Sequence, residues 1–248
     1  MDKSDIRKQF KIRKLPFICT PFVGNNETAL RNECNLWKMD TSDIIEWRID
    51  YFDDYQDIDA LLNMYETLRE ELNNAVILIT LRTLKQGGKA DLSEVRYLEI
   101  LSALCEYDID LLDIEDNMSM NIKQKLIEIT NQQGILSILS HHNFIKTDDC
   151  NLIEKQFLSM ADFDPDILKV AYMANCEEDV TSLLIKTKEV NDRVEQALIS
   201  ISMGEVGRAS RLNAYQYGSI LSFAILKEAS APGQISLKEM KEYYKKPR

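Results

Sequence analysis

Eight apolar runs of strand length recur along the chain with helix-like stretches between them, which predicts an α/β fold of the (β/α)8 TIM-barrel type. Alternation of strands and helices indicates a parallel sheet, and eight such units close naturally into a barrel. The length of 248 residues is typical of that fold. The alternative is a doubly wound open sheet. It is disfavoured because no glycine-rich phosphate-binding motif follows a strand.

The elements follow from hydrophobic spacing and helix-forming composition. The predicted strands cover residues 17–23, 43–47, 75–81, 109–114, 135–140, 167–171, 197–203 and 218–224. The predicted helices cover residues 27–39, 58–72, 92–106, 122–130, 152–161 and 177–188. The seventh connection, residues 206–215, is short. A last helix begins at Ser236, because Glu239 three residues later completes a capping box.

A single domain is expected, because no linker or low-complexity tract divides the chain. We assign residues 15–248 to the catalytic barrel. Residues 1–14 are basic and contain no apolar core of the signal-peptide type. They are expected to form a capping or solvated segment.

The composition excludes several classes of protein. A net charge of −11 argues against a general nucleic-acid-binding surface. Five scattered cysteines without a Cys-x-x-Cys pair indicate free thiols in the cytoplasm. Only two histidines are present, and they are adjacent, which disfavours a multi-histidine metal site. No stretch approaches the roughly 18 apolar residues of a membrane helix.

One lysine interrupts a strand that is otherwise apolar. Lys169 lies between Leu168 and Val170. Burial disfavours an ammonium group, and a neutral amine is what forms a Schiff base with a carbonyl substrate. The alternative is a lysine that extends from a strand end to water. The polar residues at the other strand ends favour the first interpretation.

Acid and base residues lie near the ends of two other predicted strands. Glu46 and Arg48 are two residues apart and therefore share a face, either as a buried pair or as an exposed ion pair. Asp113 and Glu115 share a face in the same way and could order the basic groups. The C-terminal ends of barrel strands are where active sites lie, so these side chains are expected to gather there.

The remaining strand ends supply a base and further hydrogen-bond donors. His141 and His142 follow the fifth run, and one of them is a candidate general acid/base. Arg82 and Arg211 can hold a carboxylate through paired hydrogen bonds. The turn at residues 230–234 adds a hydroxyl and an amide. This set fits a polyhydroxylated carboxylate that also has a carbonyl, with imine formation followed by proton abstraction.

These motifs, in this order, resemble the type I 3-dehydroquinate dehydratases of the shikimate pathway. The resemblance extends from about residue 16 to 235. Any one motif is weak, whereas the ordered set is highly specific. The matching residues are Glu46, Arg48, Arg82, Gly87, Gly88, Ser140, His142, Phe144, Lys169, Ser210, Arg211 and residues 230–234.

The resemblance implies a role for each site residue. Lys169 forms the Schiff base with the ketone of 3-dehydroquinate, and His142 removes the neighbouring proton and then protonates the departing hydroxyl in a syn elimination to 3-dehydroshikimate. Arg211 binds the carboxylate, and Thr20 could add a contact. The family uses no metal or cofactor, and its members are commonly homodimers. The other implied substrate contacts are Glu46, Arg48, Arg82, Ser230 and Gln234.

Two positions depart from the pattern of many members. Gln86 stands where they have Glu, and Asn143 where they have Asp. A carboxylate near His142 would raise its pKa, whereas an amide orients the ring without adding charge. We therefore expect a base of lower pKa and a pH optimum shifted down. Two alternatives remain from the residues alone, a class I aldolase and a non-catalytic anion-binding protein.

Overall fold

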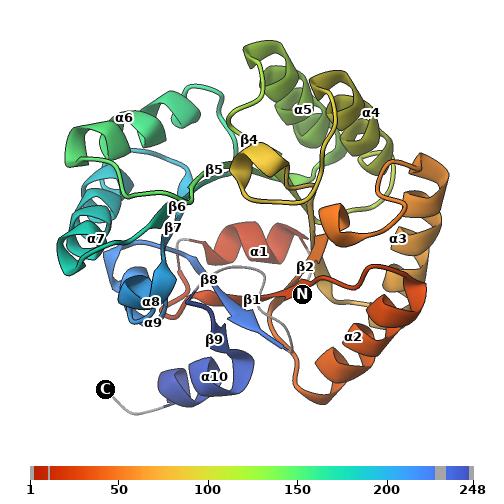
Figure 1. Cartoon of the computed structure of the whole chain (residues 1–248), viewed down its shortest axis with the longest axis horizontal. Helices are drawn as coiled ribbons and strands as arrows, with labels where there is room; N and C mark the ends of the chain where they lie inside the picture. Colours follow the sequence, from red (N-terminus) through yellow and green to blue (C-terminus); the bar gives the residue numbers. More distant parts are fainter. Residues whose placement is uncertain (1–2, 11, 227–232, 246–248) are drawn as a thin grey trace.

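A computed structural model describes residues 3–10, 12–226 and 233–245 of the chain. Parallel strands curl into a barrel that a ring of helices surrounds (Figure 1), as the sequence predicts. The first eight strands are β1 (Phe17–Phe22), β2 (Ile44–Arg48), β3 (Val76–Thr80), β4 (Leu111–Glu115), β5 (Leu136–Asn143), β6 (Ile167–Met173), β7 (Ala197–Met203) and β8 (Leu221–Ile225). The predicted TIM-barrel class is confirmed.

The sheet order is β7-β6-β5-β4-β3-β2-β1-β8-β9, with the short β9 (Ile235–Ser236) at its end. Leu198 in β7 forms an isolated bridge with Ser219, which lies just before β8. Next to it, the backbone N–H of Ile220 donates to the carbonyl of Leu198 at 2.8 Å. These contacts close the barrel, so the C-terminal ends of distant strands share one rim.

Helices follow the strands and begin at capping residues. Asn26, Asp57, Ser93 and Asp149 each accept a hydrogen bond from a backbone N–H in the first turn that follows. The predicted cap at Ser236 is also present, because its hydroxyl accepts from the N–H of Glu239 at 3.2 Å. The main helices are α2 (Glu27–Met39), α3 (Ile58–Leu72), α4 (Glu94–Leu104), α5 (Met120–Gln133), α6 (Cys150–Ala161), α7 (Glu177–Asn191) and α10 (Leu237–Lys245).

Three predicted boundaries are wrong in an informative way. Strands β5 and β6 each run past their predicted ends, to Asn143 and Met173, because they pair with one another as far as Asn143 and Tyr172, and Met173 pairs with Met203 in β7. Strand β8 begins at Leu221, not at residue 218. Gly218 adopts φ +101 and ends the 3-10 helix η3 (Ala214–Tyr217), a conformation that suits glycine and that no strand residue adopts.

The N-terminal helix α1 (Lys3–Gln9) lies across the N-terminal end of the barrel (Figure 1). Its Ile6 is fully buried and packs with the apolar residues of the barrel interior, among them Phe17 and Ile167 at the starts of β1 and β6. Arg7 pairs with Asp166 at 2.6 Å. This end of the barrel is therefore covered.

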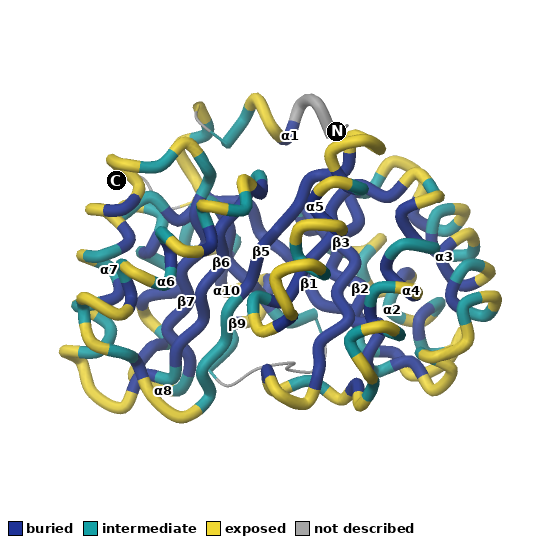
Figure 2. Tube along the Cα trace, turned by 90° about the horizontal axis from the view of Figure 1, so that it is seen from above, coloured by how far each residue is buried: buried dark blue, intermediate teal, exposed yellow. Residues whose placement is uncertain are grey.

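Two apolar layers enclose the strands, which appear as the buried centre in Figure 2. One layer lies between strands and helices and includes Trp47, Tyr97 and Phe157. The other layer lies inside the barrel. In β6, Leu168 and Val170 belong to the outer layer, whereas Ile167 and Ala171 face inward. Alternation along the strand therefore places Lys169 inside the barrel.

Candidate active site

A cavity opens among inward-facing side chains at the C-terminal end of the barrel. Its wall includes seven of the eight predicted site residues. The eighth, Ser230, lies outside the described residues. The seven are Glu46, Arg48, Arg82, His142, Lys169, Arg211 and Gln234.

Lys169 lies in this cavity with its side chain 4 % exposed. Its Nζ donates to Oδ2 of Asp113 at 3.0 Å, and Oε1 of Glu46 lies 4.0 Å away. The ring of Phe223 lies 4.8 Å from Nζ. The burial expected from the sequence is present, and the structure adds a carboxylate partner for the amine. The amine therefore has to give up the Asp113 contact before it can attack a carbonyl.

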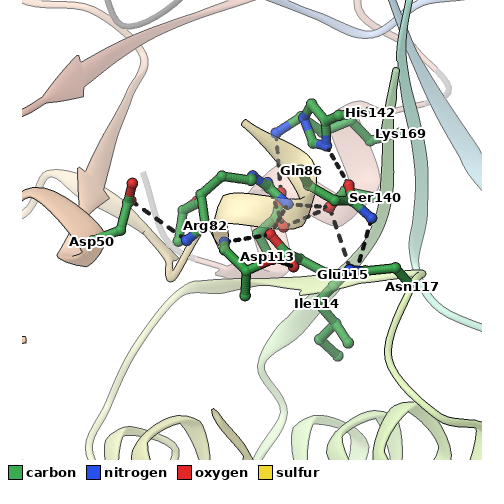
Figure 3. Close-up of polar contacts among 12 residues, drawn as sticks. Asp50, Arg82, Gln86, Asp113, Ile114, Glu115, Asn117, Ser140, His142 and Lys169 are labelled. Carbon is green, nitrogen blue, oxygen red and sulfur yellow. Dashed lines mark hydrogen bonds and ion pairs between the residues drawn. The ribbon is translucent and has the colours of Figure 1, made fainter. Parts of the chain in front are cut away.

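Asp113 connects Lys169 to Arg82 through hydrogen bonds to both side chains (Figure 3). Its Oδ1 accepts from Arg82 at 2.7 Å and from the hydroxyl of Ser140 at 2.6 Å. Burial raises the pKa of Asp113. The charges of Arg82 and Lys169, with hydrogen bonds from Ser140 and Lys169, outweigh burial and lower that pKa to about 2. Asp113 is thus an anion at neutral pH, and the sequence indicated it only as a group that could order the bases.

Arg82 is held by acids on one side of the cavity. Besides Asp113, its guanidinium donates to Oε1 of Glu115 at 3.0 Å. Glu115 also accepts from the N–H and hydroxyl of Thr83, at 2.8 and 2.6 Å. Burial lowers the pKa of Arg82, and the two carboxylates raise it further than burial lowers it. Arg82 is therefore a permanent cation in a fixed position.

Arg48 pairs with an acid other than the one that the spacing indicated. Both Glu46 and Arg48 are buried. However, the guanidinium of Arg48 donates two hydrogen bonds of 2.8 Å to the carboxylate of Asp50. Glu46 instead accepts from the hydroxyl of Thr80 at 2.9 Å. Asp50 also accepts from the backbone N–H of Lys89 at 3.1 Å. The predicted Glu46–Arg48 pair is wrong, and Asp50 was missed because it lies in the turn just past the strand.

Two further predicted contacts differ in their surroundings. Arg211, in the short helix α9 (Ser210–Asn213), is 4 % exposed, and burial lowers its pKa to about 10, so it stays charged at neutral pH. Thr20 is also buried, but its hydroxyl bonds that of Ser42 at 2.7 Å, and it is not part of the cavity wall. The structure thus gives no support to a substrate contact at Thr20.

The two histidines occupy different sides of β5. His142 faces the cavity, and its Nδ1 lies 2.8 Å from Oε1 of Gln86. An amide oxygen only accepts, so Nδ1 carries the proton and Nε2 keeps its lone pair. Burial lowers the pKa of His142 well below its ordinary value, and the charges of Arg82 and Lys169 lower it further. His141 packs on the opposite side against Tyr172, with ring centroids 5.6 Å apart.

Two glycines let the loop after β3 approach the site closely. Gly87 adopts φ +78 where the 3-10 helix η2 (Leu84–Gln86) ends, and a Cβ there would lie 2.3 Å from the ring of Phe144. A Cβ on Gly88 would lie 2.1 Å from the carbonyl of Arg82. Phe144 in turn stacks on His142 with ring centroids 6.3 Å apart. The glycines therefore allow Gln86 to reach His142.

A larger cavity, of about 680 Å³, lies at the opposite end of the barrel beneath α1. Its wall includes the ion pair of Arg7 and Asp166. The N-terminal ends of barrel strands serve stability, whereas chemistry belongs to the C-terminal ends. We therefore place the active site at the smaller cavity, whose wall includes both Lys169 and His142.

A family profile described as type I 3-dehydroquinase matches residues 18–247, which is most of the chain. The chain belongs to the type I 3-dehydroquinase family. The family that the ordered motifs indicated is thereby confirmed. Among named relatives, the 3-dehydroquinate dehydratase of Alkaliphilus oremlandii is 34% identical over 229 residues, covering 92% of this chain and 90% of that protein. That of Listeria welshimeri is 33% identical over 227 residues, covering 91% and 90%.

Solved structures of this family have the same fold. The 3-dehydroquinate dehydratase of Geobacillus kaustophilus superimposes with a TM-score of 0.89 at 29% identity, covering 92% of this chain and 89% of that one. The type I enzyme of Clostridium difficile, in a structure with covalently modified comenic acid, also has a TM-score of 0.89, at 31% identity with 92% and 91% covered. The barrel is therefore that of a type I 3-dehydroquinase.

Proposed function

We propose that this protein dehydrates 3-dehydroquinate to 3-dehydroshikimate through an imine on Lys169, with His142 as the base. Membership of the type I 3-dehydroquinase family makes the protein a lyase of the shikimate pathway. The observation that carries the residue assignment is one cavity that holds a buried amine and an imidazole whose Nε2 is unprotonated. An amine and a base are the two groups that imine-assisted elimination requires.

The first half of the reaction builds the imine. The neutral amine of Lys169 attacks the substrate ketone, and the resulting carbinolamine takes up a proton from solvent and loses water to give a protonated imine. The final hydrolysis of the imine returns that proton to solvent. Asp113 has a pKa of about 2 and is therefore a weak base, so it serves as a counter-ion to the cationic forms. Its carboxylate, 3.0 Å from Nζ, is placed to stabilise the positive nitrogen of the imine.

The second half eliminates water. The protonated imine withdraws electrons from the adjacent C–H bond, so Nε2 of His142 can remove that proton and leave an enamine. The imidazolium then protonates the departing hydroxyl, and the imine is re-formed as the C–O bond breaks. Water hydrolyses this imine to release the conjugated ketone and Lys169. One molecule of water is lost overall, and His142 and Lys169 return to their starting states.

The other cavity residues orient the substrate. We assign its carboxylate to Arg211, which lies on the rim and is cationic at neutral pH. The hydroxyl groups of the substrate would form hydrogen bonds with Glu46, Arg48 and Gln234. Arg82 and Ser230 would be the remaining substrate contacts, as the family resemblance implies. Arg48 and Arg82 keep their positions through the carboxylates they bind, which limits the reorganisation needed when the substrate enters.

Trapping the imine tests the proposal directly. The protein would be mixed with 3-dehydroquinate and borohydride, and intact-mass spectrometry and peptide mapping would follow. A reduced adduct on Lys169, together with absorbance from the conjugated product in an untreated sample, supports the assignment. Product formation without an adduct on Lys169 overturns the imine mechanism. Cleavage of a carbon–carbon bond would instead indicate the aldolase alternative.

The assembly and location of the protein are also proposals. We propose a homodimer, as the family resemblance implies, and a location in the cytoplasm, as the scattered cysteines predict. Within the described residues, no helix is long and apolar enough to cross a membrane, and all five cysteines are free thiols. Light scattering coupled to size-exclusion chromatography measures the mass in solution, and a monomer over the working concentration range would contradict the dimer.

A further inference from the structure

The side-chain amide of Gln86 lies between His142 and a residue outside the cavity wall, Asn117 (Figure 3). Its Oε1 faces Nδ1 of His142 at 2.8 Å, and its Nε2 donates to Oδ1 of Asn117 at 3.0 Å. Gln86 is 3 % exposed, whereas Asn117 lies at the exposed end of the loop that follows β4. The three side chains thus form a chain of hydrogen bonds from the surface to the base.

The direction of this amide decides which nitrogen of His142 carries the proton. An amide has an acceptor and a donor of nearly equal size, and a half-turn about its last bond exchanges them. With oxygen toward His142, Nδ1 is protonated and Nε2 is free to accept a proton. With nitrogen toward His142, Nδ1 becomes the acceptor, so the proton of the neutral ring moves to Nε2. The base would then have no lone pair directed into the cavity.

We propose that Asn117 is a positioning residue that selects the productive direction of the Gln86 amide and so the reactive tautomer of His142. This inference rests on the proposed role of His142 as the base. Asn117 is itself an amide, and in the structure its Oδ1 faces Gln86. In that direction it accepts from Nε2 of Gln86 and holds the Gln86 oxygen toward the ring. A carboxylate at position 86 would need no such partner, because both of its oxygens accept and a half-turn changes nothing. The need for Asn117 therefore follows from having glutamine at position 86.

A double-mutant cycle tests this dependence. Asn117→Ala removes the selecting acceptor, so the ratio of the productive to the unproductive amide direction is expected to fall about fivefold, the factor that one hydrogen bond represents. The value of kcat should therefore fall, by at most about fivefold. KM should not change, because Asn117 does not line the cavity. In a Gln86→Glu background, Asn117→Ala should leave kcat unchanged. Asn117→Asp keeps an acceptor and should retain the activity that Asn117→Ala loses.

Nitrogen NMR of the histidine rings gives a readout that an indirect structural effect would not produce. The chain has only two histidines, so a protein labelled with ¹⁵N-histidine has two imidazole spectra, and a His141→Gln variant assigns them. In the wild type, the proton of His142 should lie on Nδ1. In Asn117→Ala it should shift toward Nε2, and in the Gln86→Glu, Asn117→Ala protein it should return to Nδ1.

The outcomes separate this inference from the proposed function. Equal losses of kcat from Asn117→Ala in the wild-type and Gln86→Glu backgrounds, or an unchanged tautomer, would overturn the positioning role while borohydride still traps the imine on Lys169. If wild-type protein forms product without any adduct on Lys169, the proposed mechanism fails first. A loss confined to the wild-type background, with the tautomer shift, establishes the role of Asn117.

Discussion

Nζ of Lys169 donates a 3.0 Å hydrogen bond to Oδ2 of Asp113, and both side chains are almost fully buried. The same carboxylate accepts from Arg82 and from Ser140. One carboxylate thus pairs with two cations at the centre of the site, and it connects the proposed nucleophile to a fixed arginine. This arrangement makes the acid at position 113 important for both stability and chemistry.

Asp113→Asn is expected to destabilise the protein by about 3 kcal/mol, because removing the charge of Asp113 leaves the buried Lys169 without its nearest counter-ion. Urea unfolding followed by circular dichroism measures the change in the free energy of unfolding. The control is Glu27→Gln, which breaks the exposed pair with Arg31 and should change stability too little to measure. Equal stability of Asp113→Asn and wild type would show that the ion pair is not needed for folding.

Lys169→Met should lower kcat by at least about 10³-fold, because the variant keeps the volume of the side chain but has no nucleophile. Substrate binding measured by calorimetry should persist, since the arginines remain. Lys186→Met removes an amine that pairs with Glu154 and Glu189 on the helical surface, and it should keep full activity. Wild-type turnover in Lys169→Met would rule out the imine.

The pH dependence of kcat reports on His142. Its pKa is held well below the ordinary value, so the base is neutral at pH 7 and activity should fall only as pH falls through that lowered pKa. Gln86→Glu places a carboxylate beside Nδ1, which stabilises the imidazolium and raises the pKa of His142. The acidic limb of the profile should then move to higher pH. Gln132→Glu, an exposed change on α5, should leave the profile in place.

The same burial of a neutral His142 predicts lower stability in acid. Because the unfolded ring titrates near about 6.5, the unfolded state binds the additional proton at a higher pH than the folded state does. The free energy of unfolding should therefore decrease as pH falls below that value. His142→Asn should lose this part of the dependence. An identical slope in both proteins from about pH 6.5 downward would contradict the lowered pKa.

Gly87→Ala should impair catalysis, and Gly134→Ala provides a matched control. Both glycines have positive φ, +78 and +67, so alanine costs about 1–2 kcal/mol of backbone strain at either position. A Cβ at Gly134 meets nothing within 4 Å, whereas at Gly87 it would overlap Phe144 and displace Gln86. We expect both variants to lose stability, Gly87→Ala more than Gly134→Ala because of the overlap, and kcat to fall only for Gly87→Ala. Equal kcat values would show that the loop position is not critical.

Arg211→Gln should raise KM by about 10-fold or more while the imine can still be trapped at high substrate concentration, because a charge-assisted contact to a carboxylate contributes roughly 1.5–3 kcal/mol. Arg208→Gln is the control, since Arg208 is 43% exposed and pairs with Glu239 outside the cavity. Steady-state kinetics of both variants decide the assignment. An unchanged KM in Arg211→Gln would place the substrate carboxylate elsewhere.

Much of the site could be predicted because its residues carry local signals. A lysine inside an apolar strand, two adjacent histidines at a strand end and glycines after β3 are all visible in the order of residues, and alternation in β6 determines that Lys169 faces inward. Pairing was harder to predict. Arg48 pairs with Asp50 in the following turn and not with Glu46 on its own strand, because the path of the chain after β2 brings that carboxylate to the guanidinium.

By itself, the sequence determined the order of the eight barrel strands and of the main helices, the barrel class, the family and seven residues of the cavity wall. Those properties follow from hydrophobic spacing and from motifs a few residues long. The tertiary structure decided which charges meet. Asp113 reaches Lys169 across 56 positions, and Asn117 reaches Gln86 across 31. Such contacts depend on strand register and on the curvature that closes the barrel, which no local pattern contains.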